Sequence, residues 1–293
     1  MAEPTVEFFI PFYGDPDYLL EAVESIRAMD DPEWRLTVLD DCYPHADVGA
    51  RVAALADPRI EVHRNEQNLG ANGNYRSAID RAVADYVVIM GADDRVLPGY
   101  LSRVRAALAA TGAAIVQPRA AVIDEEGRRY LPLGDRVKSW LAPRPAGVTA
   151  YRGERFAASL LTGNWTYFPS LCWHRETIQR IGFRDYDVVQ DLALIIDVLL
   201  AGGGFAVAPA LAFEYRRHRL SDSSVRALTG ERFAEERAYL ATIASELDAH
   251  GWPWAARAAR ARLTSRLNAG LTALSVAPRD RPAARRIART ALS

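Results

Sequence analysis

The chain has few cysteines. Of its 293 residues only Cys42 and Cys172 are cysteine, and both lie in apolar or strand-like stretches. Two distant cysteines in a chain of this length form neither a disulfide framework nor a zinc site. We therefore expect both to be reduced core residues in a reducing compartment.

Long apolar runs are also absent. The richest stretch, residues 192–201, contains Asp197 and is shorter than the roughly 18 residues that a membrane-spanning helix needs. The first residues lack the basic segment and apolar run of a signal peptide. We expect a cytoplasmic protein, and the sequence leaves peripheral contact with the inner membrane face open.

The chain has no excess of charge of either sign. It carries 36 basic and 37 acidic residues, for a net charge of -1 at pH 7. Nothing in this balance favours a nucleic-acid partner. With 49% apolar and 25% charged residues, the composition is that of a globular protein. The length suits one large α/β domain, alone or with a helical appendage.

Strands and helices alternate in the first part of the chain. Short apolar runs, typical of buried strands, occupy residues 6–10, 34–39, 60–63, 86–90 and 114–117. The segments between them have helical periodicity, and the connections are short. This alternation predicts an α/β fold with a mostly parallel, doubly wound sheet. Ligands of such sheets bind outside the carboxyl ends of the strands.

The second part is less regular. We expect a hairpin over residues 123–130, a Pro-rich basic loop over 134–147, helices over 153–161 and 188–200, and short strands over 205–208 and 211–216. Beyond about residue 228 the pattern is helical, with breaks at residues 251–253 and at Pro278. We divide the chain into residues 1–117, 118–227 and a C-terminal helical extension, 228–293.

Two acidic pairs follow predicted strands. Asp93 and Asp94 end one strand, and Asp40 and Asp41 end another, so both pairs belong to the same rim. Adjacent carboxylates suit Mg²⁺ or Mn²⁺, which bind carboxylate and phosphate oxygens. The alternative is a helix cap at Asp94 with Asp93 solvated. For Asp40 the choices are contact with a base or ribose and an Asx turn.

Two further polar residues stand out. Asp191 lies near the start of an apolar helix, where a half-buried carboxylate can serve as a general base. The alternative is stabilisation of the helix dipole. His218 ends the segment of residues 215–218 and can bind a metal or a phosphate, or be an ordinary surface histidine.

Six ordered segments resemble motifs of the inverting glycosyltransferases of family 2, which have the GT-A fold. The resemblance covers roughly residues 5–220. The matching segments are Ile-Pro-Phe-Tyr (10–13), Val-Leu-Asp-Asp (38–41), the loop 65–70 with Asn74 after it, Gly-Ala-Asp-Asp-Arg-Val-Leu-Pro (91–98), Gln-Asp-Leu (190–192) and Tyr-Arg-Arg-His (215–218).

The resemblance implies transfer of a sugar from a nucleotide-diphosphate donor, by default a UDP-sugar, to an acceptor hydroxyl with inversion. The residues that it assigns to the nucleotide-sugar are Pro11, Phe12, Tyr13, Asp40, Asn74 and Asp93. It implies that Asp94, with His218, holds Mn²⁺ or Mg²⁺, and that Asp191 is the catalytic base.

Three departures from the family pattern matter. Gly91 replaces the first Asp of the metal motif, Gln190 replaces the Glu before the base, and Phe12 and Gly14 replace polar residues of the opening turn. The first two leave open a degenerate nucleotide-sugar-binding protein without transfer activity. A sugar nucleotidyltransferase is a second alternative, although residues 11–15 lack the basic residue that its loop needs.

The acceptor should be a saccharide or a lipid-linked saccharide, bound by the second half. Asn164 and Trp165 precede the predicted helix of Asp191, and Trp165 can stack on a sugar or pack in the core. The basic residues Arg257, Arg260, Arg262 and Arg266 suit a membrane-surface face. A solvated helix face or a contact between copies of the chain is the alternative.

Overall fold

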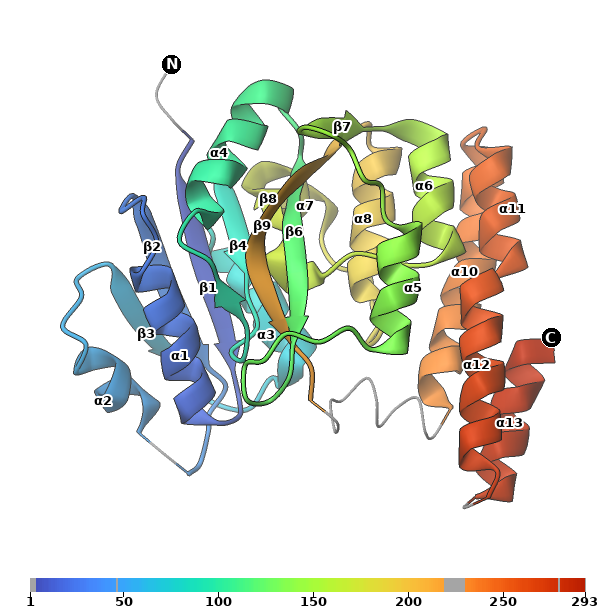
Figure 1. Cartoon of the computed structure of the whole chain (residues 1–293), viewed down its shortest axis with the longest axis horizontal. Helices are drawn as coiled ribbons and strands as arrows, with labels where there is room; N and C mark the ends of the chain where they lie inside the picture. Colours follow the sequence, from blue (N-terminus) through green and yellow to red (C-terminus); the bar gives the residue numbers. More distant parts are fainter. Residues whose placement is uncertain (1–3, 46, 219–229, 279, 293) are drawn as a thin grey trace.

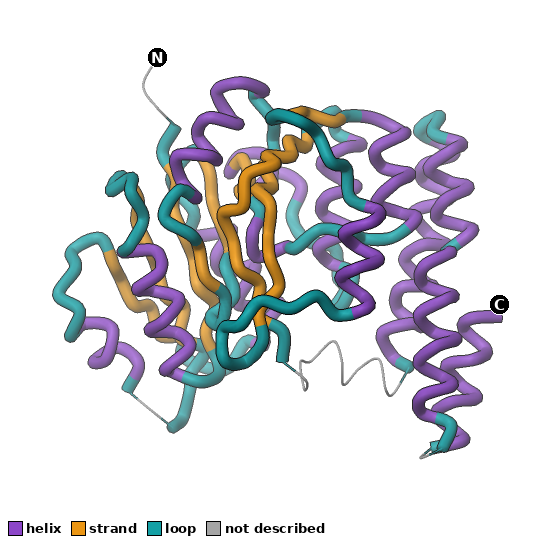
Figure 2. The backbone as a smooth tube through the Cα atoms, viewed as in Figure 1, coloured by secondary structure: helices purple, strands orange, loops and turns teal. Residues whose placement is uncertain are grey.

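The structure is a computed structural model that describes residues 4–45, 47–218, 230–278 and 280–292. One sheet runs through the molecule, with helices on both of its faces (Figures 1 and 2). The last four helices stand together at one end, where α11 packs against α6 (Figure 1). No helix of the described residues is long and apolar enough to cross a membrane.

The first half of the sheet is parallel throughout. Its strands are β1 (Val6–Phe12), β2 (Trp34–Asp40), β3 (Ile60–Arg64) and β4 (Tyr86–Ile89), in the spatial order β3-β2-β1-β4. The helices between them are α1 (Pro16–Arg27), α2 (Val48–Ala53) and α3 (Gly70–Arg81), and α4 (Tyr100–Thr111) follows. The predicted parallel, wound arrangement is confirmed for this half.

The second half of the sheet is mixed. Its strands are β5 (Arg95–Val96), β6 (Ile115–Ile123), β7 (Thr149–Tyr151), β8 (Cys172–His174) and β9 (Phe205–Arg216). Strand β8 runs antiparallel between β4 and β6, whereas β9 is parallel to β6 and antiparallel to β5 and β7. The antiparallel pairs are short and all involve strands of this half, so the sheet as a whole is mostly parallel, as predicted. The two predicted strands near the end of the sheet are one continuous strand, β9.

The remaining helices include one in a segment for which the sequence predicted a loop. They are α5 (Leu133–Leu141), α6 (Gly153–Thr162), α7 (Arg175–Ile181) and α8 (Gln190–Leu200), with a 3₁₀ turn at Phe168–Ser170. The expected loop over residues 134–147 contains α5, which is anchored by the buried carboxylate of Asp135. The expected hairpin over 123–130 is reduced to a single bridge between Ile123 and Arg129.

The C-terminal extension is helical, as predicted. It consists of α10 (Glu231–Ala249), α11 (Pro253–Ala261), α12 (Leu263–Val276) and α13 (Arg281–Leu292). The expected breaks near Gly251 and Pro278 are present, and Arg262, at φ 48°, makes a further break between α11 and α12. The predicted boundary at residues 227 and 228 lies outside the described residues.

Two hydrophobic cores sandwich the sheet. Successive residues of β1 point to opposite faces, so Phe8 enters the core under α1 and α4, and Phe9 enters the core under α3, α6 and α8. Cys172 is buried in the first core, and burial raises the pKa of its thiol. Cys42 is only partly buried, so the expectation of a core residue holds for Cys172 alone.

Candidate functional site

The acidic pairs meet at one rim of the sheet. Strand β1 pairs in parallel with both β2 and β4, with Phe12 opposite Asp40 and Phe9 opposite Ile89. The carboxyl ends of these strands therefore lie side by side, and the polar residues that follow them share the lower edge in Figure 1. This is the position at which parallel sheets bind ligands.

The opening turn offers Tyr13 rather than Phe12. The Phe12 side chain is fully buried and packs edge-on against Tyr43. The prediction that Phe12 lines a nucleotide is therefore wrong for its side chain, because in an extended strand its ring faces the core. Tyr13 is 56% exposed, and its ring meets Tyr43 edge-on at 5.5 Å. Pro11 is the next-to-last residue of β1, two positions before Tyr13.

Asp40 is buried at the end of β2 and already has partners. Its Oδ1 accepts a hydrogen bond from the Tyr43 amide at 2.8 Å, and its Oδ2 pairs with the guanidinium of Arg64. The Arg64 side chain is half exposed, so the ion pair lies at the surface of the rim. Sequence reasoning missed both Tyr43 and Arg64, since neither belongs to a recognisable motif.

The side chain of Asn74 makes hydrogen bonds within the protein. Its amide nitrogen donates to the Leu39 carbonyl at 2.9 Å, and its amide oxygen accepts from Asn65 at 3.2 Å. Asn65 also donates to Asp41 at 2.9 Å. The side chain of Asn74 is buried and both of its polar atoms are hydrogen-bonded within the protein, so its contact with the nucleotide stays a prediction. The network ties the loop after β3 to the end of β2.

A short strand pair brings two motifs together that lie far apart in the chain, 91–98 and 215–218. Strand β5 pairs antiparallel with β9, with Arg95 opposite Glu214 and Val96 opposite Phe213. The same register places the Arg216 amide 2.8 Å from Asp94 Oδ1. Two residues further on, His218 Nε2 lies 2.8 Å from Asp93 Oδ2. The pKa of His218 is raised, first by this hydrogen bond to Asp93.

The carboxylates of Asp93 and Asp94 converge over Gly91. A Cβ atom at position 91 would lie 2.6 Å from Asp94 Oδ2 and 2.9 Å from Asp93 Oδ1. Asp94 is 1% exposed, and its Oδ2 is buried without a hydrogen-bond partner among the described residues. The pKa of Asp94 lies well above its usual value, first because of burial and then because of Asp93. One oxygen of this carboxylate pair, Asp94 Oδ2, is therefore left as an acceptor without a donor among the described residues.

Arg216 holds these carboxylates in place. Its buried guanidinium donates to the Asp93 carbonyl at 2.7 Å, to the carbonyls of Asp124 and Glu125 at 3.1 and 3.0 Å, and to Glu21 at 2.6 Å. The side chain thus joins α1, the turn after β6 and the acidic turn after β4. Sequence reasoning described it only as a basic neighbour of His218.

Asp191 lies at the start of α8 and faces Asn164, as expected. Asn164 Nδ2 donates to Asp191 Oδ2 at 3.0 Å. Trp165 is 1% exposed, is packed edge-on against Phe156 and Phe205, and donates to the Ser159 hydroxyl. The prediction that Trp165 stacks on a sugar is therefore wrong, because its ring belongs to the hydrophobic core.

Tyr75 lies near both groups of acids. Burial first, and then the negative charges of Asp93, Asp94 and Asp191, raise the pKa of its phenol to about 12. These three acids come from the turn after β4 and from the start of α8, and all of them act on the same side chain. The predicted metal residues and the predicted base therefore both lie within electrostatic reach of Tyr75.

A cluster on α5 adjoins this site. Asp135 accepts from the Tyr167 hydroxyl at 2.9 Å and from the Arg217 guanidinium at 2.6 and 2.8 Å. One turn later, Lys138 donates to the Thr166 carbonyl at 2.9 Å. The Arg217 contact connects α5 to the segment that carries His218. The sequence analysis missed this cluster, because it read residues 134–147 as a loop.

The described residues contain no cluster of three or more His, Cys, Asp or Glu side chains arranged to hold a metal ion.

Residues 7–175, more than half of the chain, match the profile of "Glycosyl transferase family 2". The chain belongs to this family. Membership confirms the resemblance read from the ordered motifs, and it sets aside the sugar nucleotidyltransferase alternative.

Family 2 relatives are named for polysaccharide synthesis. The chain is 26% identical over 230 residues to the succinoglycan biosynthesis protein ExoO of Rhizobium meliloti, an alignment that covers 76% of this chain and 63% of that one. It is 29% identical over 100 residues to the putative colanic acid biosynthesis glycosyl transferase WcaA of Escherichia coli, across 34% and 36% of the two chains. The alignments thus span less than two thirds of these relatives.

Solved structures share the fold at low sequence identity. The first 349 residues of TarS of S. aureus, in complex with UDP-GlcNAc, superpose with a TM-score of 0.62 at 15% identity, covering 80% of this chain and 65% of that one. GalNAc-T7 with UDP, GalNAc and Mn²⁺ has a TM-score of 0.56 at 15% identity, covering 74% and 44%. The family 2 chain therefore has the GT-A fold, here with a C-terminal helical region.

Proposed function

We propose that the protein transfers a sugar from a nucleotide-diphosphate donor, preferably a UDP-sugar, to an acceptor hydroxyl with inversion of configuration. The observation that carries the proposal is the convergence of the Asp93 and Asp94 carboxylates over Gly91, with His218 beside Asp93. Family membership, the names of the relatives and the UDP complexes of structural neighbours support it. In this scheme residues 1–117 bind the donor and 118–227 the acceptor.

The acidic turn suits a divalent cation. Asp94 Oδ2 has no partner among the described residues, Asp93 Oδ1 approaches the same space above Gly91, and His218 adjoins Asp93. Carboxylate oxygens and an imidazole are ligands for Mn²⁺, and Mg²⁺ accepts the carboxylates. We assign the metal to Asp93 and Asp94 together, with His218. A bound cation would neutralise the charge that develops on the leaving diphosphate.

Side chains of the protein would bind the base and the ribose of the donor and deprotonate the acceptor hydroxyl. Tyr13 presents its ring to the base, and Asp40, with Pro11 beside it, lies where the ribose would bind. Asp191 accepts the proton of the acceptor hydroxyl as that oxygen attacks. Asn164 keeps the second oxygen of this carboxylate oriented through its 3.0 Å hydrogen bond. The acceptor therefore approaches between the start of α8 and the segment that carries Asn164.

Transfer can be tested against the one alternative that Gly91 and Gln190 leave, a binding protein without activity. Release of UDP from UDP-glucose, UDP-galactose and UDP-GlcNAc would be followed with Mn²⁺ present, for the wild type and Asp191→Asn. We expect turnover of one donor, and a loss of 10²- to 10⁴-fold in the variant without weaker UDP binding. UDP binding with no turnover of any donor, even with a saccharide acceptor mixture, would favour the alternative.

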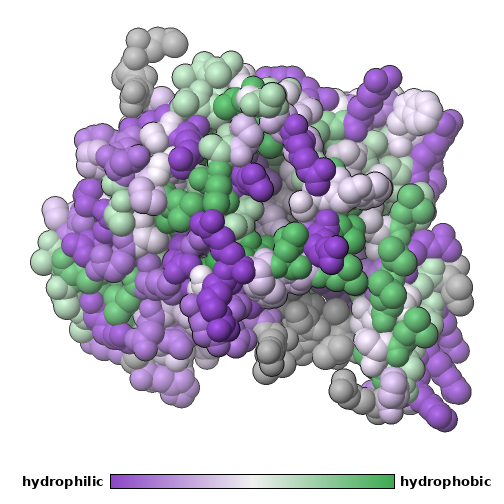
Figure 3. All heavy atoms as spheres, in the orientation of Figure 1, coloured by the Kyte–Doolittle hydropathy of each residue, from purple (hydrophilic) through white to green (hydrophobic). Residues whose placement is uncertain are grey.

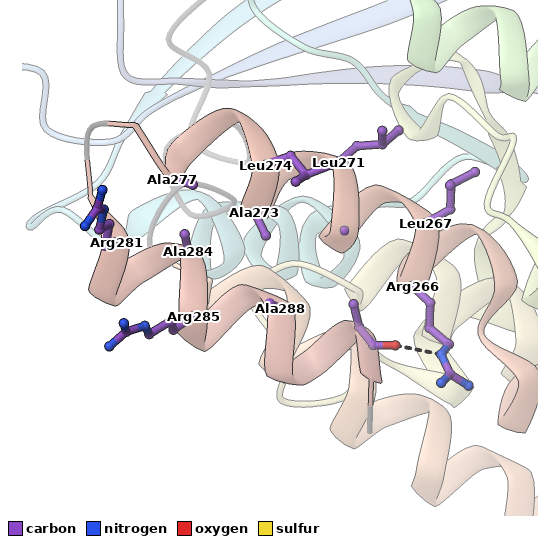
Figure 4. Close-up of a pocket in the computed structure, with 12 residues that line it drawn as sticks. Arg266, Leu267, Leu271, Ala273, Leu274, Ala277, Arg281, Ala284, Arg285 and Ala288 are labelled. Carbon is purple, nitrogen blue, oxygen red and sulfur yellow. Dashed lines mark hydrogen bonds between the residues drawn. The ribbon is translucent and has the colours of Figure 1, made fainter.

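The C-terminal helices supply an apolar surface. Four leucines on one side of α12 are 51–73% exposed: Leu263, Leu267, Leu271 and Leu274. A row of hydrophobic residues follows α12 on the face that Figure 3 shows. A groove of about 660 Å³ runs along α12 and α13. It is lined by Arg281 and Arg285 and by three of these leucines, Leu267, Leu271 and Leu274 (Figure 4). Exposed apolar patches of this kind mark interaction sites.

The charge of the C-terminal helices indicates which partner this surface binds. Residues 253–293 contain nine arginines and a single acidic residue, Asp280. An anionic lipid surface attracts such a face, whereas a second copy presenting the same face would be repelled. We propose peripheral contact with the inner membrane face through α12 and α13, which suits a lipid-linked saccharide acceptor.

Of the four arginines that the sequence pointed to, Arg266 lines this groove and the other three do not. Arg257 lies over the Trp254 ring, Arg260 pairs with Asp248, and Arg262 is buried. The Arg266 guanidinium donates to the Ala291 carbonyl. The exposed arginines of α13, with Arg266, therefore form the basic border of this surface in place of Arg257, Arg260 and Arg262.

A further inference from the structure

A cavity of about 710 Å³ lies between the sheet and α5. Its walls come from β6, from the bend of β9 and from the side of α5 that faces the sheet. Figure 3 shows a recess at the centre of the face of the molecule that is in view, between the sheet and α5. None of the motif residues assigned to the nucleotide, the metal or the base lines it.

The cavity is positively charged. Four cationic side chains line it, Arg119, Arg129, Lys138 and Arg144, and its wall has no carboxylate side chain among the described residues. Arg129 pairs with Glu214, while Lys138 and Arg144 donate to backbone carbonyls that carry no charge.

Arg119 has the least compensation. It is exposed, and no hydrogen bond or ion pair of its side chain occurs among the described residues. Three of the four cations, Arg119, Lys138 and Arg144, thus lack a carboxylate partner. An anionic group on a ligand would supply one.

The remaining walls suit a sugar. Tyr130 and Tyr167 provide aromatic surface, and Gln117 provides an amide. Gln117 is 7% exposed, and its buried Oε1 has no hydrogen-bond partner among the described residues. Buried polar atoms are rarely left without a partner, so this one marks a place for an added donor. Sugar hydroxyls are donors of that kind, and the aromatic walls suit the apolar faces of a sugar ring.

A chain of hydrogen bonds links the cavity to the predicted base. Lys138 donates to the Thr166 carbonyl at 2.9 Å, and the Thr166 hydroxyl and amide donate to Asn164 Oδ1 at 2.6 and 3.1 Å. Asn164 in turn donates to Asp191 at 3.0 Å. A saccharide held in the cavity would therefore have its neighbouring unit close to the start of α8.

We propose that this cavity binds an anionic unit, bearing a carboxylate or a phosphate, of the saccharide acceptor. The inference rests on the proposed function, of which it names the acceptor class. Arg119 and Arg144 meet the anionic group, and Lys138 joins the bound unit to the segment that orients Asp191. The specificity of the cavity is then for acidic over neutral glycans of equal length.

Binding of trigalacturonic acid and of the neutral trisaccharide maltotriose, measured by calorimetry on the full chain, tests the inference. We expect binding of trigalacturonic acid at least tenfold tighter than that of maltotriose. The double variant Arg119→Ser/Arg144→Ser should lose this preference at least tenfold. Arg128→Ser, which removes an exposed arginine that does not line the cavity, should keep it. Inorganic phosphate as a competitor distinguishes a site for a bare anion from one for a saccharide.

The outcomes separate this inference from the function on which it rests. Equal binding of the two trisaccharides, or of neither, would overturn the inference, and so would an equal loss in Arg128→Ser. Phosphate that displaces the glycan at equal concentration would also overturn it, since the site would then hold an anion without a sugar. UDP binding, measured on the same samples, reports on the proposed function independently, because no residue of the cavity belongs to the donor site.

Discussion

His218 Nε2 lies 2.8 Å from Asp93 Oδ2, although 125 positions separate the two residues in the chain. The contact depends on the β5–β9 strand pair, which carries the acidic turn and the end of β9 to the same place. If this pair forms part of the metal site, the imidazole of His218 helps Asp93 to hold the metal ion.

Removal of the imidazole should therefore weaken metal binding. We expect His218→Ala to bind Mn²⁺ roughly 10- to 100-fold more weakly in the presence of UDP, the range seen when partners of a metal site are lost. The measurement is a manganese titration followed by electron paramagnetic resonance. His63→Ala is the matched control, because His63 lies on β3 beside Arg81, away from the acidic turn. An equal loss in both variants would contradict the assignment.

A single methyl group at position 91 should disturb the same site. In Gly91→Ala the added Cβ would lie 2.6 Å from Asp94 Oδ2, so the carboxylates must move apart. We expect Mn²⁺-dependent UDP binding to fall by about tenfold or more. Gly14→Ala, in the opening turn, adds a Cβ that meets nothing within 4 Å and should bind normally. Unchanged binding in Gly91→Ala would place the metal elsewhere.

Arg216 should matter for stability as well as for the site. In Arg216→Ala the carbonyls of Asp93, Asp124 and Glu125 lose a buried donor, and we expect the free energy of unfolding to fall by about 2–4 kcal/mol. Arg128→Ala removes an exposed ion pair and should lower the free energy of unfolding much less. Urea denaturation of both variants measures the difference. Equal midpoints would show that Arg216 does not hold the turn.

Glycan binding to the cavity should depend on pH through Lys138. Burial is the main cause that lowers the pKa of this ammonium group, to about 8. Lys138 therefore loses its charge as pH rises through 8, and binding of trigalacturonic acid should weaken between pH 7 and pH 9. The charged groups that act on it are Arg217, Asp191, Asp135 and Arg232. In Lys138→Arg the charge persists, and calorimetry should show constant affinity across this range. A parallel decline in the variant would exclude Lys138 as the titrating group.

The leucines of α12 should control membrane contact. We expect the protein to sediment with vesicles of phosphatidylglycerol and phosphatidylcholine, and less so with phosphatidylcholine alone. Leu267→Glu/Leu271→Glu should lose this binding, because it places charge on the apolar face. Val83→Glu changes an equally exposed apolar residue far from α12 and should bind normally. Dimerisation of the wild type that disappears in the double variant would instead identify a contact between copies.

The order of the motifs predicted much of the site from the sequence. Asp40, Asp93 and Asp94 follow strands whose parallel pairing could be inferred from strand–helix alternation, so their common rim was foreseeable. The hydrogen-bond partner of each side chain could not be foreseen from the sequence. Phe12 and Tyr13 are neighbours in the chain, but the alternation of a strand sends one into the core and leaves the other exposed.

The parts that were missed depend on tertiary contacts. Helix α5 begins beside Pro132 and Gly134, which favour a loop, and its position is fixed by the ion pair of Asp135 with Arg217, 82 positions away. Trp165 next to a polar Asn164 is compatible with a surface site, yet its ring fills space between Phe156 and Phe205. No local pattern carries this information.

Calorimetric titration of UDP, with and without Mn²⁺, into the wild type and Asp93→Asn/Asp94→Asn tests the central claim most directly. The account predicts binding that requires Mn²⁺ and is tighter than that of dTDP or GDP. It also predicts loss of UDP binding in a double variant that still unfolds cooperatively. UDP that binds equally well without metal, or equally well to the double variant, would contradict the proposed role of the acidic turn. Absence of binding by all three nucleotides would contradict the proposed function itself.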